Sequence, residues 1–173
     1  MANKKEKRVA LGTIELSSEV YVSDPCYGVD TWCQAFVSSL KSGKYQGFMT
    51  IKDFGPDALG GIRVTNLWVA HENNIKNYPT TLISHSIGVD SGSAGIFDKD
   101  YYEKYHPLED SDNGENAQWY ERQFKLRYDC DKEGIALDGK GVVSFSGFGD
   151  GSYSLYAGKN SKNEIVSLRI RFI

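Results

Sequence analysis

The segment EIVSLRIRFI, residues 164–173, alternates between apolar and polar side chains more regularly than any other part of the chain. Its apolar positions are Val166, Leu168, Ile170 and Phe172, and the polar positions between them are Ser167, Arg169 and Arg171. Successive side chains of a strand point to opposite faces of a sheet, so this period of two predicts a strand with one buried face. Such a strand needs partners, and we therefore look first for an antiparallel sheet.

Other segments of strand character recur along the chain and supply those partners. They are 8–16, 19–25, 45–54, 60–72, 80–90, 141–148 and 152–158. The segments 45–54 and 60–72 flank the turn GPDALGG and are expected to pair. The last three strands are expected to form a meander through the turns GDG and KNSKN. A content of 11 Tyr and 18 Gly against 4 Pro agrees with strands joined by tight turns.

Three segments have helical character instead. Asp30 is predicted to cap a helix over 31–43, in which apolar residues recur at helical spacing and Gly43 provides the stop. Asp98 is predicted to cap a short helix over 98–106, and Asn116 a longer one over 116–128. Because strands outnumber helices, the predicted fold class is α+β, mainly antiparallel β, either β-sandwich-like or a strongly curved sheet, with two or three helices.

The length of 173 residues favours one compact domain, which we place at residues 9–173. Residues 1–8, MANKKEKR, are basic and are predicted to form a flexible tail. No apolar run approaches the roughly 20 residues that cross a bilayer, so no membrane association is expected. The three cysteines, Cys26, Cys33 and Cys130, are scattered and suggest reduced thiols, hence a cytoplasmic location.

The formal net charge of −3 is unevenly distributed. Residues 98–121 hold eight acidic residues and two lysines, whereas residues 159–173 hold four basic residues and one glutamate. A dominant basic balance, as in nucleic-acid-binding proteins, is missing, which argues against a nucleic-acid partner.

Three motifs place an aspartate beside small or turn-forming residues. Asp24 lies in SDPCY, Asp90 in GVDSGSAGIFD and Asp150 in SGFGDG. An aspartate in a turn often accepts a hydrogen bond from the backbone two residues on, which gives each a structural interpretation. If the three carboxylates converge instead, they could bind Mg²⁺ or Ca²⁺, which prefer oxygen ligands.

Together, SDPCY, GVDSGSAGIFD and SGFGDGSYSLYAGKNSKNEIVSLRIRF resemble a family of bacterial and phage proteins, domain of unknown function 4241. The resemblance extends from about Ser23 to Phe172 and is most specific in the last two motifs. Asn163 stands where the family pattern has glycine in the final hairpin. The resemblance implies a compact domain in which the motif positions form a shared site, and it implies no particular activity.

Backbone N–H groups of DSGSAG could form an anion-binding nest with aromatic walls, and Arg169 or Arg171 could recognise a phosphate. The candidate ligand-binding residues are Asp24, Tyr27, Asp90, Ser91, Gly92, Ser93, Gly95, Phe148, Asp150, Tyr153 and Arg169. This interpretation predicts a non-enzymatic protein that binds a small, nucleotide-like ligand without a cofactor.

Two alternatives stay open. A metal-dependent hydrolase would use Asp24, Asp90 and Asp150 to hold Mg²⁺ or Ca²⁺ and to activate a water molecule. A structural or protein-interaction module would need no pocket chemistry. The sequence has no Walker loop, no nucleophile elbow around Ser91 or Ser93 and no recognisable nucleophile–base pair, so binding is favoured over catalysis. The oligomeric state is left open by the sequence.

Overall fold

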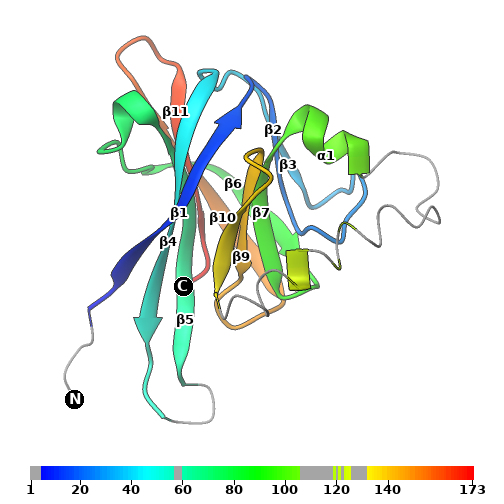
Figure 1. Ribbon diagram of the computed structural model, residues 1–173, viewed down its shortest axis with the longest axis vertical. Coiled ribbons are helices and arrows are strands. Elements are labelled where there is room, and N and C mark those ends of the chain that lie inside the picture. Colours follow the sequence, from blue (N-terminus) through cyan, green and yellow to red (C-terminus); the bar gives the residue numbers. More distant parts are fainter. Residues whose placement is uncertain (1–4, 57–59, 106–118, 120, 122, 126–131) are drawn as a thin grey trace.

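The computed structural model describes residues 5–56, 60–105, 119, 121, 123–125 and 132–173 (Figure 1). Two sheets make up most of this part of the chain, and every pair of neighbouring strands in them is antiparallel. The predicted class, α+β with a predominance of antiparallel β, is confirmed.

The larger sheet is built from strands at both ends of the chain. Its strands are β1 (Lys7–Leu16), β4 (Gly43–Asp53), β5 (Ile62–His71), β6 (Thr81–Val89), β10 (Gly151–Lys159) and β11 (Ile165–Arg171). Within the described residues its order is β1–β4–β5–β11–β10–β6. The predicted pairing of 45–54 with 60–72 is confirmed as β4 with β5. Between β5 and β6 the chain forms a short 3₁₀-helix, η1 (Glu72–Asn74), and must pass β11 and β10.

The smaller sheet comprises β2 (Val20–Ser23), β3 (Ala35–Val37), β7 (Ser93–Asp98), β8 (Gly134–Leu137) and β9 (Gly141–Phe145). As far as the structure describes the chain, its order is β3–β2–β7–β9–β8. Helix α1 (Lys99–Tyr105) follows β7 directly, as the sequence predicted for 98–106. Figure 1 shows α1 beside β2 and β3, on the right of the molecule.

The main core lies between the two sheets and makes the arrangement sandwich-like. Leu67 and Leu168 of the larger sheet belong to the same buried cluster as Val22, Ile96 and Val142 of the smaller one. A second cluster, which includes Phe97, Tyr102 and Trp119, brings α1 and the smaller sheet together. In β11 the predicted alternation is confirmed from Leu168 to Arg171, because Leu168 and Ile170 are fully buried while Arg171 is exposed, whereas Ser167 on the predicted polar face is also fully buried.

The predicted helix over 31–43 is wrong. After a turn at residues 31–34, β3 pairs with β2, and Leu40 forms a bridge with Ile165. Asp30 and Ser39 have φ values of 63° and 70°, which a helix does not tolerate. Val37 and Leu40 are buried in the core although the segment is not a helix, so the spacing of its apolar residues did not discriminate between helix and strand.

The predicted meander is also wrong in part. β10 and β11 form the expected hairpin, but β9 pairs with β7 and β8 in the other sheet. Gly147 and Gly149, with φ values of 61° and 115°, redirect the chain between the sheets, a conformation that glycine adopts without steric cost. Strand β8 was not predicted at all.

The remaining predictions on chain organisation fall partly outside the described residues. β1 begins at Lys7, so the end of the predicted tail at 1–8 belongs to a strand, and residues 1–4 are outside the description. Of the predicted helix 116–128, Trp119, Glu121 and 123–125 are helical, and its other positions are not described. No helix in the described part of the chain is long and apolar enough to cross a membrane.

Candidate functional site

The turn between β6 and β7, residues 90–92, is where the three aspartate motifs meet. Asp24, at the end of β2, is fully buried, and its carboxylate accepts four hydrogen bonds. Its Oδ1 accepts from the backbone N–H of Cys26 (2.8 Å) and from the hydroxyl of Ser91 (2.7 Å). Its Oδ2 accepts from the backbone N–H groups of Asp90 (2.8 Å) and Ser91 (2.7 Å). Asp24 thus fixes the turn, and its bond to Cys26 confirms the structural interpretation of a turn aspartate.

The other two aspartates also contact protein groups. The hydroxyl of Tyr27 donates to Oδ2 of Asp90 at 2.6 Å, and the N–H of Gly92 donates to Oδ1 of Asp150 at 3.0 Å. Among the described residues, no group of three or more His, Cys, Asp or Glu side chains could hold a metal ion. The structure therefore gives no support to the predicted Mg²⁺ or Ca²⁺ site at Asp24, Asp90 and Asp150.

The predicted anion nest exists, but its anions belong to the protein. The consecutive N–H groups of Asp90, Ser91 and Gly92 all donate to the carboxylates of Asp24 and Asp150. Such a run of backbone donors suits an anion, and here the buried carboxylate of Asp24 and the exposed one of Asp150 satisfy it. The motif GVDSGSAGIFD is thus engaged by the chain itself.

The small residues of this motif serve close packing. A Cβ on Gly95 would lie 2.7 Å from the carbonyl oxygen of Val142 in β9. Gly92 has a φ of 65° and open space around it, so its backbone conformation is what requires glycine. Ser93 is fully buried, and its hydroxyl donates to the carbonyl of Ser91 at 3.4 Å.

Phe148 and Tyr153 belong to the next turn. The Tyr153 hydroxyl donates to the carbonyls of Ser146 (2.9 Å) and Gly149 (2.5 Å), which closes the turn after β9. Burial raises the pKa of Tyr153, so the hydroxyl remains a donor. Phe148 is 56% exposed and packs edge-on against Phe54 at 5.5 Å. Of the predicted aromatic walls, Phe148 and Tyr153 therefore belong to another turn, whereas Tyr27 contacts Asp90 in the 90–92 turn.

A pocket lies instead on the β10–β11 hairpin. It has a volume of about 220 Å³ and is lined by Ser152, Tyr153, Ser154, Tyr156, Arg171, Phe172 and Ile173. Ser154 is directly opposite Arg171, and Tyr156 is directly opposite Arg169. Opposite residues of an antiparallel pair share a face, so the serine, the tyrosine and both arginines stand on the polar face of β11 that the sequence indicated. The exposed Arg171 donates from Nε to the carbonyl of Ile173 at 3.2 Å.

Arg169, the predicted ligand residue of this face, is held between two tyrosines. Its guanidinium carbon lies 4.4 Å from the centre of the Tyr156 ring and 4.7 Å from that of Tyr78. Its Nη1 donates to Oδ1 of Asn66 and to the hydroxyl of Tyr78, both at 3.0 Å. Arg169 therefore secures the segment between β5 and β6, from which Tyr78 comes, to the polar face of the larger sheet.

Two buried donors beside this arrangement are unused. Within the described part of the chain, neither Nε of Arg169 nor Nε1 of Trp68 has a hydrogen-bond acceptor. Trp68 in β5 is directly opposite Arg169 in β11. Trp68 also stacks on Phe48 with a separation of 4.3 Å between ring centres. Buried N–H groups without an acceptor are rare in folded proteins, so these two groups remain able to donate to an additional acceptor.

The charge of this part of the sheet is positive. The adjacent strands β5, β11, β10 and β6 hold no acidic residue; their charged side chains are Arg63, Lys159, Arg169 and Arg171. The sequence pointed to both arginines of β11 but not to Tyr78, Asn66 or Tyr156. The register of the hairpin β10–β11 would have placed Tyr156 beside Arg169, whereas no sequence signal leads to Tyr78.

Comparison with known proteins places the chain in a family. No curated protein and no solved structure shows a match to it. Residues 83–170 match the family described as Protein of unknown function (DUF4241), which confirms the resemblance carried by the second and third motifs. The matched part runs from β6 to β11 and covers half of the chain. The chain therefore belongs to the DUF4241 family.

Proposed function

We propose that the protein binds a small anionic ligand with an aromatic ring, of the nucleotide class, in the pocket on β10 and β11. The observation that carries this proposal is the juxtaposition of Arg171, Ser154 and the Tyr156 ring on one face of the hairpin. The three groups supply a positive charge, a hydroxyl and an aromatic surface within one pocket.

Each group has a defined role toward such a ligand. The planar guanidinium of Arg171 suits the oxygens of a phosphate, which it can contact through two parallel N–H bonds. The hydroxyl of Ser154, opposite it, can donate to a third oxygen. The Tyr156 ring, already in contact with Arg169 on one side, offers a surface for a base. Since the four surrounding strands hold no acidic residue, nothing on them repels the anion.

The chemistry of the pocket supports binding without transformation of the ligand. Its lining residues include no aspartate, glutamate, histidine or cysteine side chain that could act as a base or nucleophile. Elsewhere, burial and the Asp24 carboxylate raise the pKa of the Cys26 thiol, which keeps it protonated and unreactive near neutral pH. We therefore propose a non-enzymatic role.

Calorimetric titration tests this proposal with AMP, adenosine and inorganic phosphate as probes. We expect AMP to bind more tightly than either part alone, because only AMP uses both the arginine and the ring. Arg171→Gln should weaken AMP binding at least tenfold, about 1.4 kcal/mol, through loss of a charge-assisted pair.

The matched control is Arg63→Gln, which removes the same charge beside Phe148 at a different part of the sheet. Binding of AMP should be nearly unchanged in this variant. Equal losses in the two variants, retention of binding in Arg171→Gln, or no binding by the wild-type protein at millimolar AMP would each overturn the proposal.

A further inference from the structure

Trp32 is the most exposed large apolar side chain among the described residues. It is 89% exposed, whereas Trp68 and Trp119 are each 2% exposed. Phe36, on the edge strand β3, is 49% exposed and follows four positions later. Exposed aromatic side chains that gather in one segment are typical of surfaces that contact a partner.

The turn that carries Trp32 is firmly held. The Nε2 of Gln34 donates to the hydroxyls of Ser23 (2.9 Å) and Tyr102 (3.0 Å) and to the carbonyl of Gly28 (2.8 Å). Its Oε1 accepts from the N–H of Thr31 at 3.2 Å. These bonds tie the turn to β2 and α1, so the backbone beneath the indole is ordered before any partner arrives. An ordered backbone reduces the conformational entropy that the turn loses on binding.

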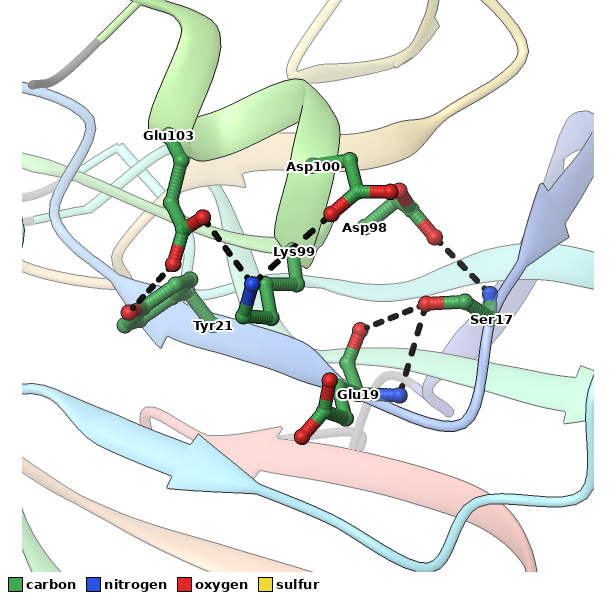
Figure 2. A network of polar contacts seen from close by, with 7 residues as sticks. All are labelled: Ser17, Glu19, Tyr21, Asp98, Lys99, Asp100 and Glu103. Carbon is green, nitrogen blue, oxygen red and sulfur yellow. Dashed lines mark hydrogen bonds and ion pairs between the residues drawn. The ribbon is translucent and has the colours of Figure 1, made fainter.

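Carboxylates lie near the Phe36 end of this surface. The Phe36 ring lies 5.2 Å from that of Tyr21, whose hydroxyl donates to Glu103 at 3.2 Å (Figure 2). Burial, the hydrogen bond to Glu103 and the charges of Glu103, Asp30 and Glu19 raise the pKa of Tyr21 to about 12. All three carboxylates therefore act on the hydroxyl beneath Phe36.

Only part of this negative charge is neutralised nearby. Figure 2 shows Lys99 between Glu103 and Asp100, with Nζ–O distances of 3.0 and 3.7 Å. In the same view, the Glu19 carboxylate makes no contact with the residues drawn. Asp30 is exposed, two positions before Trp32. A partner that covers the two aromatic rings would thus meet an excess of carboxylates.

We infer that Trp32 and Phe36, with Asp30 and Glu19 beside them, form a docking surface for a basic protein segment that places an arginine on the Trp32 indole. The indole is the best aromatic acceptor for a cation, and arginine is the cation most often found on it. The carboxylates complement the charge of such a segment and exclude an acidic one. This surface belongs to the smaller sheet, so the inference stands independently of the ligand pocket on β10 and β11.

Fluorescence anisotropy tests the inference with a labelled peptide of alternating glycine and arginine. The wild-type protein should bind this peptide, and Trp32→Ala should weaken binding at least tenfold. Asp30→Asn should weaken it less, since it removes one charge and leaves the indole. The same peptide with lysine in place of arginine should bind more weakly, because lysine lacks the planar group that stacks on the ring.

The matched control is Phe148→Ala, which removes an exposed aromatic ring that lies beside Arg63 in another part of the molecule. This variant should bind the peptide as the wild type does. Circular dichroism confirms that each variant is folded. The inference is overturned if the wild type does not bind the arginine peptide, if Trp32→Ala binds it unchanged, or if Phe148→Ala loses as much affinity.

Discussion

Replacement of Asp24 by asparagine should be among the most damaging single changes in the 90–92 turn. Each carboxylate oxygen of Asp24 accepts two hydrogen bonds, and in the less damaging orientation the amide NH₂ of asparagine replaces Oδ1, where it loses the bond from the Cys26 N–H and can donate to the Ser91 hydroxyl. The amide NH₂ group would then face the Cys26 N–H, a second donor, in a fully buried position where water cannot compensate.

The expected loss follows from these contacts. A hydrogen bond to a charged group contributes about 1.5–3 kcal/mol and a neutral one about 0.5–1.5 kcal/mol, so one lost bond and three bonds without the charge correspond to roughly 3–6 kcal/mol. Domains of this size are stable by about 5–15 kcal/mol in total. Asp24→Asn should therefore remove a large fraction of the free energy of unfolding, although asparagine has nearly the same shape as aspartate.

Urea unfolding followed by tryptophan fluorescence measures this loss, and two variants calibrate it. Asp150→Asn affects an exposed carboxylate with one bond, from Gly92, and should cost less than about 1 kcal/mol. Ser91→Ala removes the hydroxyl bond to Asp24 and keeps the backbone bonds, so it should lie between the two. If Asp24→Asn proves no more destabilising than Asp150→Asn, the reasoning on the turn is refuted.

Two further outcomes follow from the structure. Gly95→Ala should destabilise the protein by about 1–3 kcal/mol in urea unfolding, because the new Cβ would lie 2.7 Å from the carbonyl oxygen of Val142. Gly92→Ala should cost about 1 kcal/mol, because Gly92 has a positive φ and open space around it. Because the pKa of Tyr21 is raised in the folded state, its contribution to stability is fully present below its ordinary pKa of 10.0. That contribution should be lost as the pH rises toward about 12. Burial also raises the pKa of Tyr102, so ionisation of this residue should lower the stability as well. A midpoint of urea unfolding that stays constant across this range would contradict the tyrosine argument.

The parts of the fold that the sequence predicted depend on local patterns. The alternation in β11 and the hairpin of β4 and β5 are set by neighbouring residues and a short turn, and both are confirmed. The errors concern pairing between distant segments. β9 lies next to β10 in the sequence, yet it pairs with β7 and β8, because Gly147 and Gly149 in the turn after β9 lead the chain into the other sheet.

The candidate site, too, could be predicted from the sequence only in part. The motifs correctly indicated that Asp24, Asp90 and Asp150 gather near one turn, since each is connected to residues 90–92 by a hydrogen bond or by position. The direction of each carboxylate could not be predicted, because it depends on which N–H groups the folded turn leaves without a partner. The face with Arg169 was indicated by the alternation of β11, whereas its contact with Tyr78 depends on how the chain passes from β5 to β6.

The position of Asp24 also bears on where the structural unit of this family begins. The matched residues 83–170 contain the 90–92 turn, but the carboxylate that satisfies its N–H groups comes from β2, outside the matched part. The same holds for the sheets, since β11 pairs with β5 and β7 pairs with β2. Both sides of the core are thus completed by residues that precede the matched segment. A search for the functional face of this protein therefore has to include them, and Trp32 and Tyr78 are among them.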